Sequence, residues 1–219
     1  MSIKQQACAP LSSDFSASFS FMWRAALDFF PFFCYNFFMT ELFYAPRGGT
    51  SRDFVSRVLG DCYGFGNATF SRSASGKPLC DAPVCFSLSH TREYFFLAVS
   101  EKEVGADAES LSRRGDFSAI ISRLPESERA RALASPEEFL KLWTEREAVA
   151  KYLSAPVFSV FGKITLERGD DTKRRVFLNG KELPVRLFSA EIAGHAVAIC
   201  AENNEQFGKI HYLQGDLHQ

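Results

Sequence analysis

Residues 135–153 read SPEEFLKLWTEREAVAKYL and predict one long helix with a clear start. Ser135 is a favourable N-cap, Pro136 suits the first helical position, and Glu138 stands where it can complete a capping box. Apolar residues then recur at three- and four-residue spacing, which predicts a stripe buried against a sheet or another helix. The stripe consists of Phe139, Leu142, Trp143, Val149 and Leu153.

An acid and an amine lie one turn apart on the flank of this stripe. Glu147 and Lys151 follow Trp143 at successive four-residue steps. Such a pair is either a plain helix ion pair, worth about 0.3–0.5 kcal/mol, or a pair of catalytic partners. The spacing by itself leaves both interpretations open.

Composition excludes several classes of protein. The chain has 219 residues, 46% of them hydrophobic, which is enough for one sizeable core or two small ones. Lys and Arg number 25 against 26 Asp and Glu, so the overall charge indicates no nucleic-acid or membrane-surface partner. The six cysteines form no CxxC pair and no zinc-ligand spacing with the four histidines, so we expect reduced thiols and a cytoplasmic protein.

The first 38 residues differ from the rest of the chain. They are rich in Ser to about residue 20 and then in Phe over residues 21–38. Arg24, Asp28, Pro31 and Asn36 interrupt that apolar run, so neither a membrane-spanning helix nor a secretory signal fits well. We expect a poorly ordered extension before a working domain that begins at Met39, with a membrane-touching segment as the alternative.

From Met39 the pattern predicts alternating strands and helices. A helix is expected from Thr50 or Ser51 to Leu59, ended by Gly60, and two more over residues 117–121 and 125–133. The Asn179-Gly180 dipeptide predicts a hairpin. The expected strands cover residues 41–45, 84–90, 94–99, 104–109, 163–166, 175–178, 185–189 and 196–200.

Two carboxylates lie on one face of the expected strand 104–109. Because side chains alternate along a strand, Asp107 and Glu109 point to the same side, and Ala106 and Ala108 to the other. Close like charges favour a cation between them, and carboxylate oxygens suit Mg²⁺. If helix 135–153 packs over this strand, Glu147 supplies a third carboxylate. Taken alone, a D-x-E pattern is more often the solvent-facing side of a strand than a metal site.

Ser89 and His90 end the strand over residues 84–90 and form a second candidate site. Hydroxyl and imidazole donors at a strand end can hold a phosphate, although a single His is more often structural. The sequence contains no nucleophile elbow, Walker loop or dinucleotide fingerprint, which argues against serine-esterase chemistry and ordinary ATP or NAD binding.

Taken in order, these motifs strongly resemble the Sfp-type 4'-phosphopantetheinyl transferases. The resemblance extends from about residue 39 to about residue 202. The motifs that carry it are Gly76-Lys77-Pro78, Phe86-Ser87-Leu88-Ser89-His90-Thr91, Val104-Gly105-Ala106-Asp107-Ala108-Glu109 and Phe139-x-x-x-Trp143-Thr144-x-x-Glu147-x-x-x-Lys151. Each motif is weak to moderate by itself, but their order and spacing make the set specific.

The resemblance implies transfer of the phosphopantetheine arm of coenzyme A to a serine of an apo acyl, polyketide or peptidyl carrier protein. Mg²⁺ would be required, and adenosine 3',5'-bisphosphate would be released. Asp107, Glu109 and Glu147 would hold the metal. Glu147 would also be the general base, and Lys151 would neutralise the transferring phosphate or protonate the leaving group.

The resemblance also implies a coenzyme A site. Ser89 and His90 would bind a phosphate, while Lys77 and Pro78 would lie along the adenine and its 3'-phosphate. The upstream basic residues are less clearly matched; of the three candidates, Arg52 is better placed than Arg47 and Arg57.

The chain departs from the family pattern at two places in these motifs. Ala106 and Ala108 replace bulky β-branched residues, so the back of that strand must be filled by other side chains, such as the many Phe. Arg146 replaces a Lys before Glu147, which weakens the expectation of a phosphate contact there.

The resemblance implies an α+β fold made of two similar α/β halves related by a pseudo-twofold axis. Each half is a small antiparallel sheet on a long helix, with the active site in the cleft between them. We expect halves at residues 39–103 and 104–219, and a monomer. The alternatives are a catalytically degenerate family member that binds carrier proteins, and another Mg²⁺-dependent phosphoryl or nucleotidyl transferase.

Overall fold

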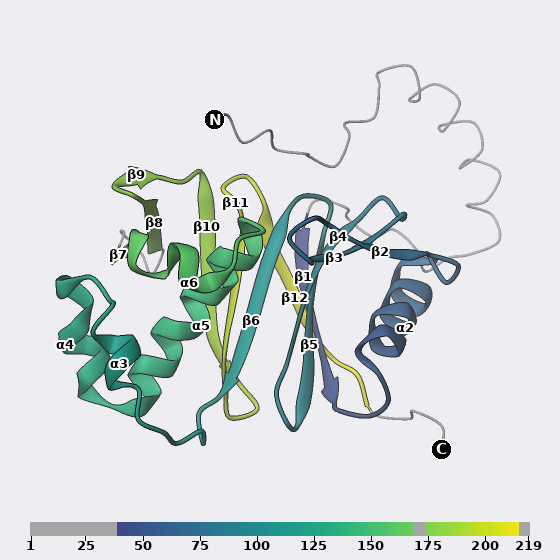
Figure 1. Cartoon of the computed structure of the whole chain (residues 1–219). Helices are drawn as coiled ribbons and strands as arrows, with labels where there is room; N and C mark the ends of the chain where they lie inside the picture. The colour runs from purple at the N-terminus through teal and green to yellow at the C-terminus, as the bar shows by residue number, and fades with distance from the viewer. Residues whose placement is uncertain (1–38, 169–173, 215–219) are drawn as a thin grey trace. The chain divides into compact units, whose positions relative to one another are not determined.

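The computed structural model describes residues 39–168 and 174–214. The expected extension over residues 1–38 lies outside the described residues. The described part is a mixed α+β fold in which two sheets carry most of the strands (Figure 1). No helix in it is both long and apolar enough to cross a membrane.

The first sheet has the strand order β12-β1-β5-β4. The four strands are β1 (Met39–Pro46), β4 (Cys85–His90), β5 (Tyr94–Ser100) and β12 (Gln206–Tyr212). β1 pairs with β5 antiparallel but with β12 parallel. The sheet is therefore mixed, and it includes a strand from the segment that we assigned to the C-terminal half.

The second sheet has the order β6-β11-β10-β8-β7, with β9 paired to β8, and its pairings are antiparallel. Asn179 and Gly180 both have positive φ in the β8–β9 turn, as the Asn-Gly prediction requires. The strands are β6 (Val104–Ser110), β7 (Ile164–Arg168), β8 (Arg174–Leu178), β9 (Lys181–Glu182), β10 (Val185–Ile192) and β11 (His195–Glu202). A separate two-stranded ribbon pairs β2 (Phe70–Arg72) with β3 (Pro78–Cys80).

Helix α2 (Ser51–Tyr63) lies beside the first sheet and is longer than expected (Figure 1). Thr50 and Asp53 form a complete capping box at its start. The prediction that Gly60 ends the helix is wrong, because Gly64, at φ 76°, takes the left-handed position. Gly60 instead permits a close contact, since a Cβ there would lie 3.2 Å from the Cα of Gly66.

Helix α5 (Pro136–Tyr152) is the long helix expected from the sequence, and it lies along β6 and β11 (Figure 1). The Ser135 side chain accepts a hydrogen bond from the Glu138 N–H, but the Glu138 carboxylate pairs with Arg131 and Lys141. The capping box is therefore only half formed. Four short segments surround α5: α3 (Ser118–Ile121), α4 (Glu126–Ala134), α6 (Val157–Val160) and the 3₁₀ turn η2 (Phe161–Lys163).

The described core falls into three groups of buried apolar side chains. One surrounds α5, one lies between α2 and the first sheet, and the third joins the two sheets. Ala106 and Ala108 belong to the third group, together with Phe96, Val197 and Ile199. The expectation that other side chains fill the back of this strand is therefore confirmed.

Candidate active site

A glycine sets the height of α5 above β6. A Cβ at Gly105 would collide with the backbone of Ala148 and Tyr152, so no other residue allows this approach without a shift. The close contact brings the last two turns of α5, which carry Glu147 and Lys151, over the strand that carries Asp107.

Lys151 and Asp107 form the central ion pair of the site. The Lys151 Nζ donates to Asp107 Oδ1 over 2.7 Å, and the Ser89 hydroxyl donates to the same oxygen over 2.8 Å. The Lys151 side chain is 31% exposed, whereas that of Asp107 is 5% exposed. The pair therefore has an anchored carboxylate and an ammonium within reach of a ligand.

Glu147 has no hydrogen bond or ion pair among the described contacts, but it lies in the electric field of the other two carboxylates. Burial raises the pKa of Glu147 to about 7, with further upward contributions from Asp107 and Glu109 and opposing ones from Lys151 and Arg113. Glu109 itself is paired with Arg113 over 2.8 Å. Asp107 and Glu109 therefore act on Glu147 through space, and a shared site of the three residues stays a prediction.

The carboxylates suit a hard cation in chemistry, although they do not enclose one. Among residues 39–168 and 174–214, no three acidic, His or Cys side chains are grouped closely enough to hold a metal as they stand. Asp107 Oδ2, however, is buried without a hydrogen-bond partner, which is costly unless a ligand completes it. A free carboxylate oxygen beside two further carboxylates fits Mg²⁺, and Asp107, Glu109 and Glu147 would be the residues to hold it.

Two serines of β4 join the edges of the sheets. The N–H of Ala106 donates to Ser87 Oγ over 2.8 Å, and the N–H of Ala108 donates to Ser89 Oγ over 3.2 Å. β6 is the edge strand of its sheet, so these hydroxyls satisfy N–H groups that would otherwise lack partners. Ser89 thus serves as a connector and as a donor to Asp107; a phosphate contact stays a prediction.

His90 lies on the other face of β4, the face whose residues Phe86 and Leu88 line a cavity that His90 itself does not line. Strand alternation places it on the side of Phe86 and Leu88, and it is exposed. Phe86 and Leu88 line a cavity of about 300 Å³ to which Arg52 and Pro78 also contribute. The structure therefore brings two of the predicted coenzyme-binding residues together, at a cavity with apolar walls and a guanidinium group.

Lys77 is directed into the protein. Its ammonium pairs with Glu103 and donates to the carbonyls of Val104 and Lys151, and its side chain is 11% exposed. It joins the start of β6 to the end of α5. A contact between Lys77 and coenzyme A stays a prediction, but in this structure the side chain does not line the cavity of Arg52 and Pro78.

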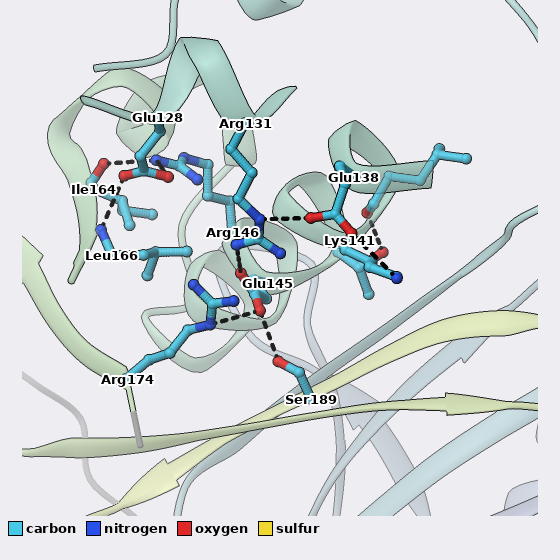
Figure 2. A network of polar contacts seen from close by, with 12 residues as sticks. Glu128, Arg131, Glu138, Lys141, Glu145, Arg146, Ile164, Leu166, Arg174 and Ser189 are labelled. Carbon is cyan, nitrogen blue, oxygen red and sulfur yellow. Dashed lines mark hydrogen bonds and ion pairs between the residues drawn. The ribbon is translucent and has the colours of Figure 1, made fainter. Parts of the chain in front are cut away.

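Arg146 lies away from Glu147, on a buried side of α5. It is fully buried, 2.8 Å from Glu128, and donates to the Ile164 carbonyl over 3.2 Å. Figure 2 shows Arg146 directed toward Glu128 and Ile164. A substrate-phosphate contact by Arg146 is not supported.

Sequence reasoning missed the polar network along α5, from Glu138 to Arg146 (Figure 2). Glu145 Oε1 accepts from Ser189 and from Arg174, each over 2.9 Å, and Glu145 is buried. Glu145 is covered by strands that lie far along the chain. Its burial therefore cannot be predicted from the neighbouring residues of the sequence. Glu145 lies three residues after Leu142, on the same side of the helix. Its burial was still not predicted, because charged residues alternate with apolar ones along this part of the helix.

Comparison with known proteins adds two similarities. A family model described as the 4'-phosphopantetheinyl transferase superfamily matches residues 103–200, which include Asp107, Glu147 and Lys151. The chain is also similar to the 4'-phosphopantetheinyl transferase gsp of Aneurinibacillus migulanus, with 25% identity over 141 residues. The matched part covers 62% of this chain and 59% of that relative, so it spans less than two thirds of the relative's length.

Proposed function

We propose that the protein transfers 4'-phosphopantetheine from coenzyme A to a serine of an apo carrier protein, because residues 103–200 match the family model described as the 4'-phosphopantetheinyl transferase superfamily. The observation that carries this proposal is the pairing of Lys151 with Asp107 beside the raised pKa of Glu147. A cation for a phosphate, an anchored carboxylate and a base of suitable pKa are the groups that such a transfer needs.

The transfer requires in-line displacement at phosphorus. The serine oxygen bonds to the phosphorus that carries the pantetheine arm, and the bond from that phosphorus to the adenosine 3',5'-bisphosphate oxygen breaks. Glu147 accepts the serine proton, directly or through water; in the metal-free protein burial raises its pKa to about 7, and a bound cation would favour the ionised form that accepts a proton. Lys151 neutralises charge on the transferred phosphate or protonates the leaving oxygen.

Mg²⁺, when bound, supplies a positive charge that stabilises the pyrophosphate oxygens. Asp107, Glu109 and Glu147 are the residues that would hold it, and the unpartnered Asp107 Oδ2 supports this assignment. Lys151 would then exchange its contact with Asp107 for one with the phosphate.

The cavity lined by Arg52 and Pro78 supports a site for the 3'-phosphoadenosine part of coenzyme A. Phe70 and Phe86 offer apolar surface for the adenine, and Arg52 and Arg72 offer guanidinium groups for the 3'-phosphate. His90, at the end of β4, lies on the same face of that strand as Phe86. The pyrophosphate would pass the end of β4 to reach Asp107.

The same sheet arrangement supports the finer proposals of an Sfp-type, single-chain enzyme that acts as a monomer. Ser87 and Ser89 of β4 bond to β6, so the sheet that borders the Arg52 cavity and the strand that carries Asp107 are joined within one chain.

The proposal is tested by incubating the protein with coenzyme A, Mg²⁺ and several apo carrier proteins and weighing each carrier. We expect a mass gain of one phosphopantetheine group and release of adenosine 3',5'-bisphosphate. No gain on any carrier, with coenzyme A bound, would indicate the degenerate binder. Turnover of a nucleotide without coenzyme A would indicate the other transferase class.

A further inference from the structure

A second cavity, of about 250 Å³, adjoins the carboxylate cluster. Thr144 lines it and stands one turn before Glu147 on α5. Ala196 lines it as well and is the cross-strand partner of Glu109 in the β6–β11 register. The cavity therefore begins one helical turn and one strand away from the proposed reaction centre.

A buried carboxylate in this cavity has one oxygen that accepts no hydrogen bond. Glu145 Oε1 is occupied by Ser189 and Arg174 (Figure 2), but Oε2 is buried without a hydrogen-bond partner. Its ion-pair partner is the Arg131 Nη1, at 3.8 Å, which is too far for a hydrogen bond, and the Glu145 side chain is 2% exposed. An acceptor in this state favours a ligand that brings an N–H or O–H donor.

The cavity also has donors to spare and no excess charge. Lys141 makes one hydrogen bond among the described residues, to Glu138, although its ammonium carries three N–H groups. The basic residues of the cavity wall are Arg131, Lys141 and Arg174, and they are matched by Glu145 and Glu191 in the wall and by Glu138 beside it. An acidic partner would require a surplus of positive charge, so a neutral ligand with both donors and acceptors fits better.

Resting on the proposed function, we infer that this cavity holds the pantetheine arm of coenzyme A. The arm is the uncharged part of the coenzyme, and its hydroxyl and two amides supply the donors and acceptors that the cavity requires. With the transferred phosphate at Lys151, the arm extends past Thr144, and one of its donors binds Glu145 Oε2. Glu145 would thus contribute to coenzyme specificity.

The test compares two ligands by calorimetry, on the full chain without a carrier protein, so that no turnover occurs. Coenzyme A carries the arm, whereas adenosine 3',5'-bisphosphate lacks it. In Glu145→Gln, an amide replaces the free oxygen and cannot accept the donor, so we expect the Kd for coenzyme A to rise about tenfold. The Kd for the bisphosphate should stay within twofold of the wild type. Glu182→Gln, which breaks an exposed Arg–Glu pair elsewhere on β8 and β9, is the matched control.

A second variant covers the case in which Glu145→Gln does not fold. Ala196→Val narrows the cavity floor and should weaken coenzyme A binding while sparing the bisphosphate. In the wild type, coenzyme A but not the bisphosphate should slow amide hydrogen exchange at residues 189–191 and 195–197.

Three results would overturn the inference. Equal weakening of both ligands would mean that Glu145 acts only through the fold. Unchanged coenzyme A binding in both variants, or equal exchange protection by the two ligands, would place the arm elsewhere. If the wild type bound coenzyme A in none of these measurements, both the proposed function and this inference would fail. If the wild type transferred phosphopantetheine normally but both variants bound coenzyme A with the wild-type Kd, only this inference would fail.

Discussion

Lys151 reaches across from the C-terminal end of α5 to Asp107 on β6, with 2.7 Å between Nζ and Oδ1, and does not pair with Glu147 one turn before it on the same helix. The spacing of Glu147 and Lys151 in the sequence would have allowed an ion pair between them, but the structure does not contain it. Lys151 holds the anchored carboxylate, and Glu147 keeps a raised pKa without a hydrogen-bonded partner among the described contacts.

Replacing Lys151 with Met should lower the rate of phosphopantetheine transfer by about 100-fold or more, because the cation that faces the phosphate is lost. Binding of adenosine 3',5'-bisphosphate should change little. Single-turnover mass spectrometry of the carrier measures the first effect and calorimetry the second. Lys181→Met, at an exposed position of β9, is the control, and equal rates in the two variants would remove Lys151 from the mechanism.

Glu147→Gln should leave coenzyme A binding largely intact and abolish transfer, because the group acts as the base only during the reaction. Transfer at the wild-type rate would mean that another group accepts the serine proton. The measurement is the same carrier assay, run beside Glu137→Gln, an acid near the start of the same helix that the site does not use.

Glu147 should also make stability depend on pH. Its pKa is about 7 in the folded protein and 4.5 as an unperturbed group, so the folded state binds more protons between those values. The free energy of unfolding of the metal-free protein therefore falls as pH rises from about 4.5 to 7. Urea unfolding at several pH values should show a steeper fall in the wild type than in Glu147→Gln. If the free energy of unfolding depended on pH in the same way in both proteins, the pKa of Glu147 would not be raised in the folded state.

Gly105→Ala should separate α5 from β6. The added Cβ collides with the helix backbone at Ala148 and Tyr152. Overpacking of this kind lowers the free energy of unfolding by about 1–3 kcal/mol. Transfer should drop by about 100-fold, since a shift of about 1 Å moves Glu147 and Lys151 from Asp107. Gly115→Ala meets only an ordinary contact, 3.5 Å from Phe117, and should be nearly neutral. Wild-type stability and rate in Gly105→Ala would show that the helix does not set the site.

Arg146→Met should destabilise the protein by about 3–5 kcal/mol, because it leaves the buried Glu128 carboxylate without its cation. Combining it with Glu128→Leu should recover much of that loss. Urea unfolding checks both, with Arg175→Met as the exposed control that should have little effect. A double variant no more stable than Arg146→Met alone would contradict the pairing.

Local patterns in the sequence predicted the elements that depend on local chemistry. The start of α5 follows from Ser135 and Pro136, and the β8–β9 hairpin from Asn179-Gly180. The alternation along β6 gave Asp107 and Glu109 a common face, and the four-residue spacing on α5 pointed to Glu147 and Lys151, whose roles stay predictions.

Local sequence patterns did not predict the contacts between segments that are distant in the chain. Gly105 looks like any strand glycine until the helix residue Ala148 packs against it, 43 positions later. The β12 strand carries no clear alternation, and its ladder with β1 shifts register between Thr40 and Leu42. The bond of Ser89 to the Ala108 N–H could not be predicted either, because the sequence does not reveal that the edge strand β6 lies beside β4.

The parallel pairing of β1 with β12 has a consequence for synthesis of the chain. Met39–Pro46 leaves the ribosome early, but its neighbour Gln206–Tyr212 follows about 160 residues later, so the first sheet cannot be completed until nearly all of the described chain has been made. Pairings between such distant segments fold slowly. Until then the outer edge of β1 is open to strands of other chains, and this interval is when a nascent molecule is most exposed to aggregation.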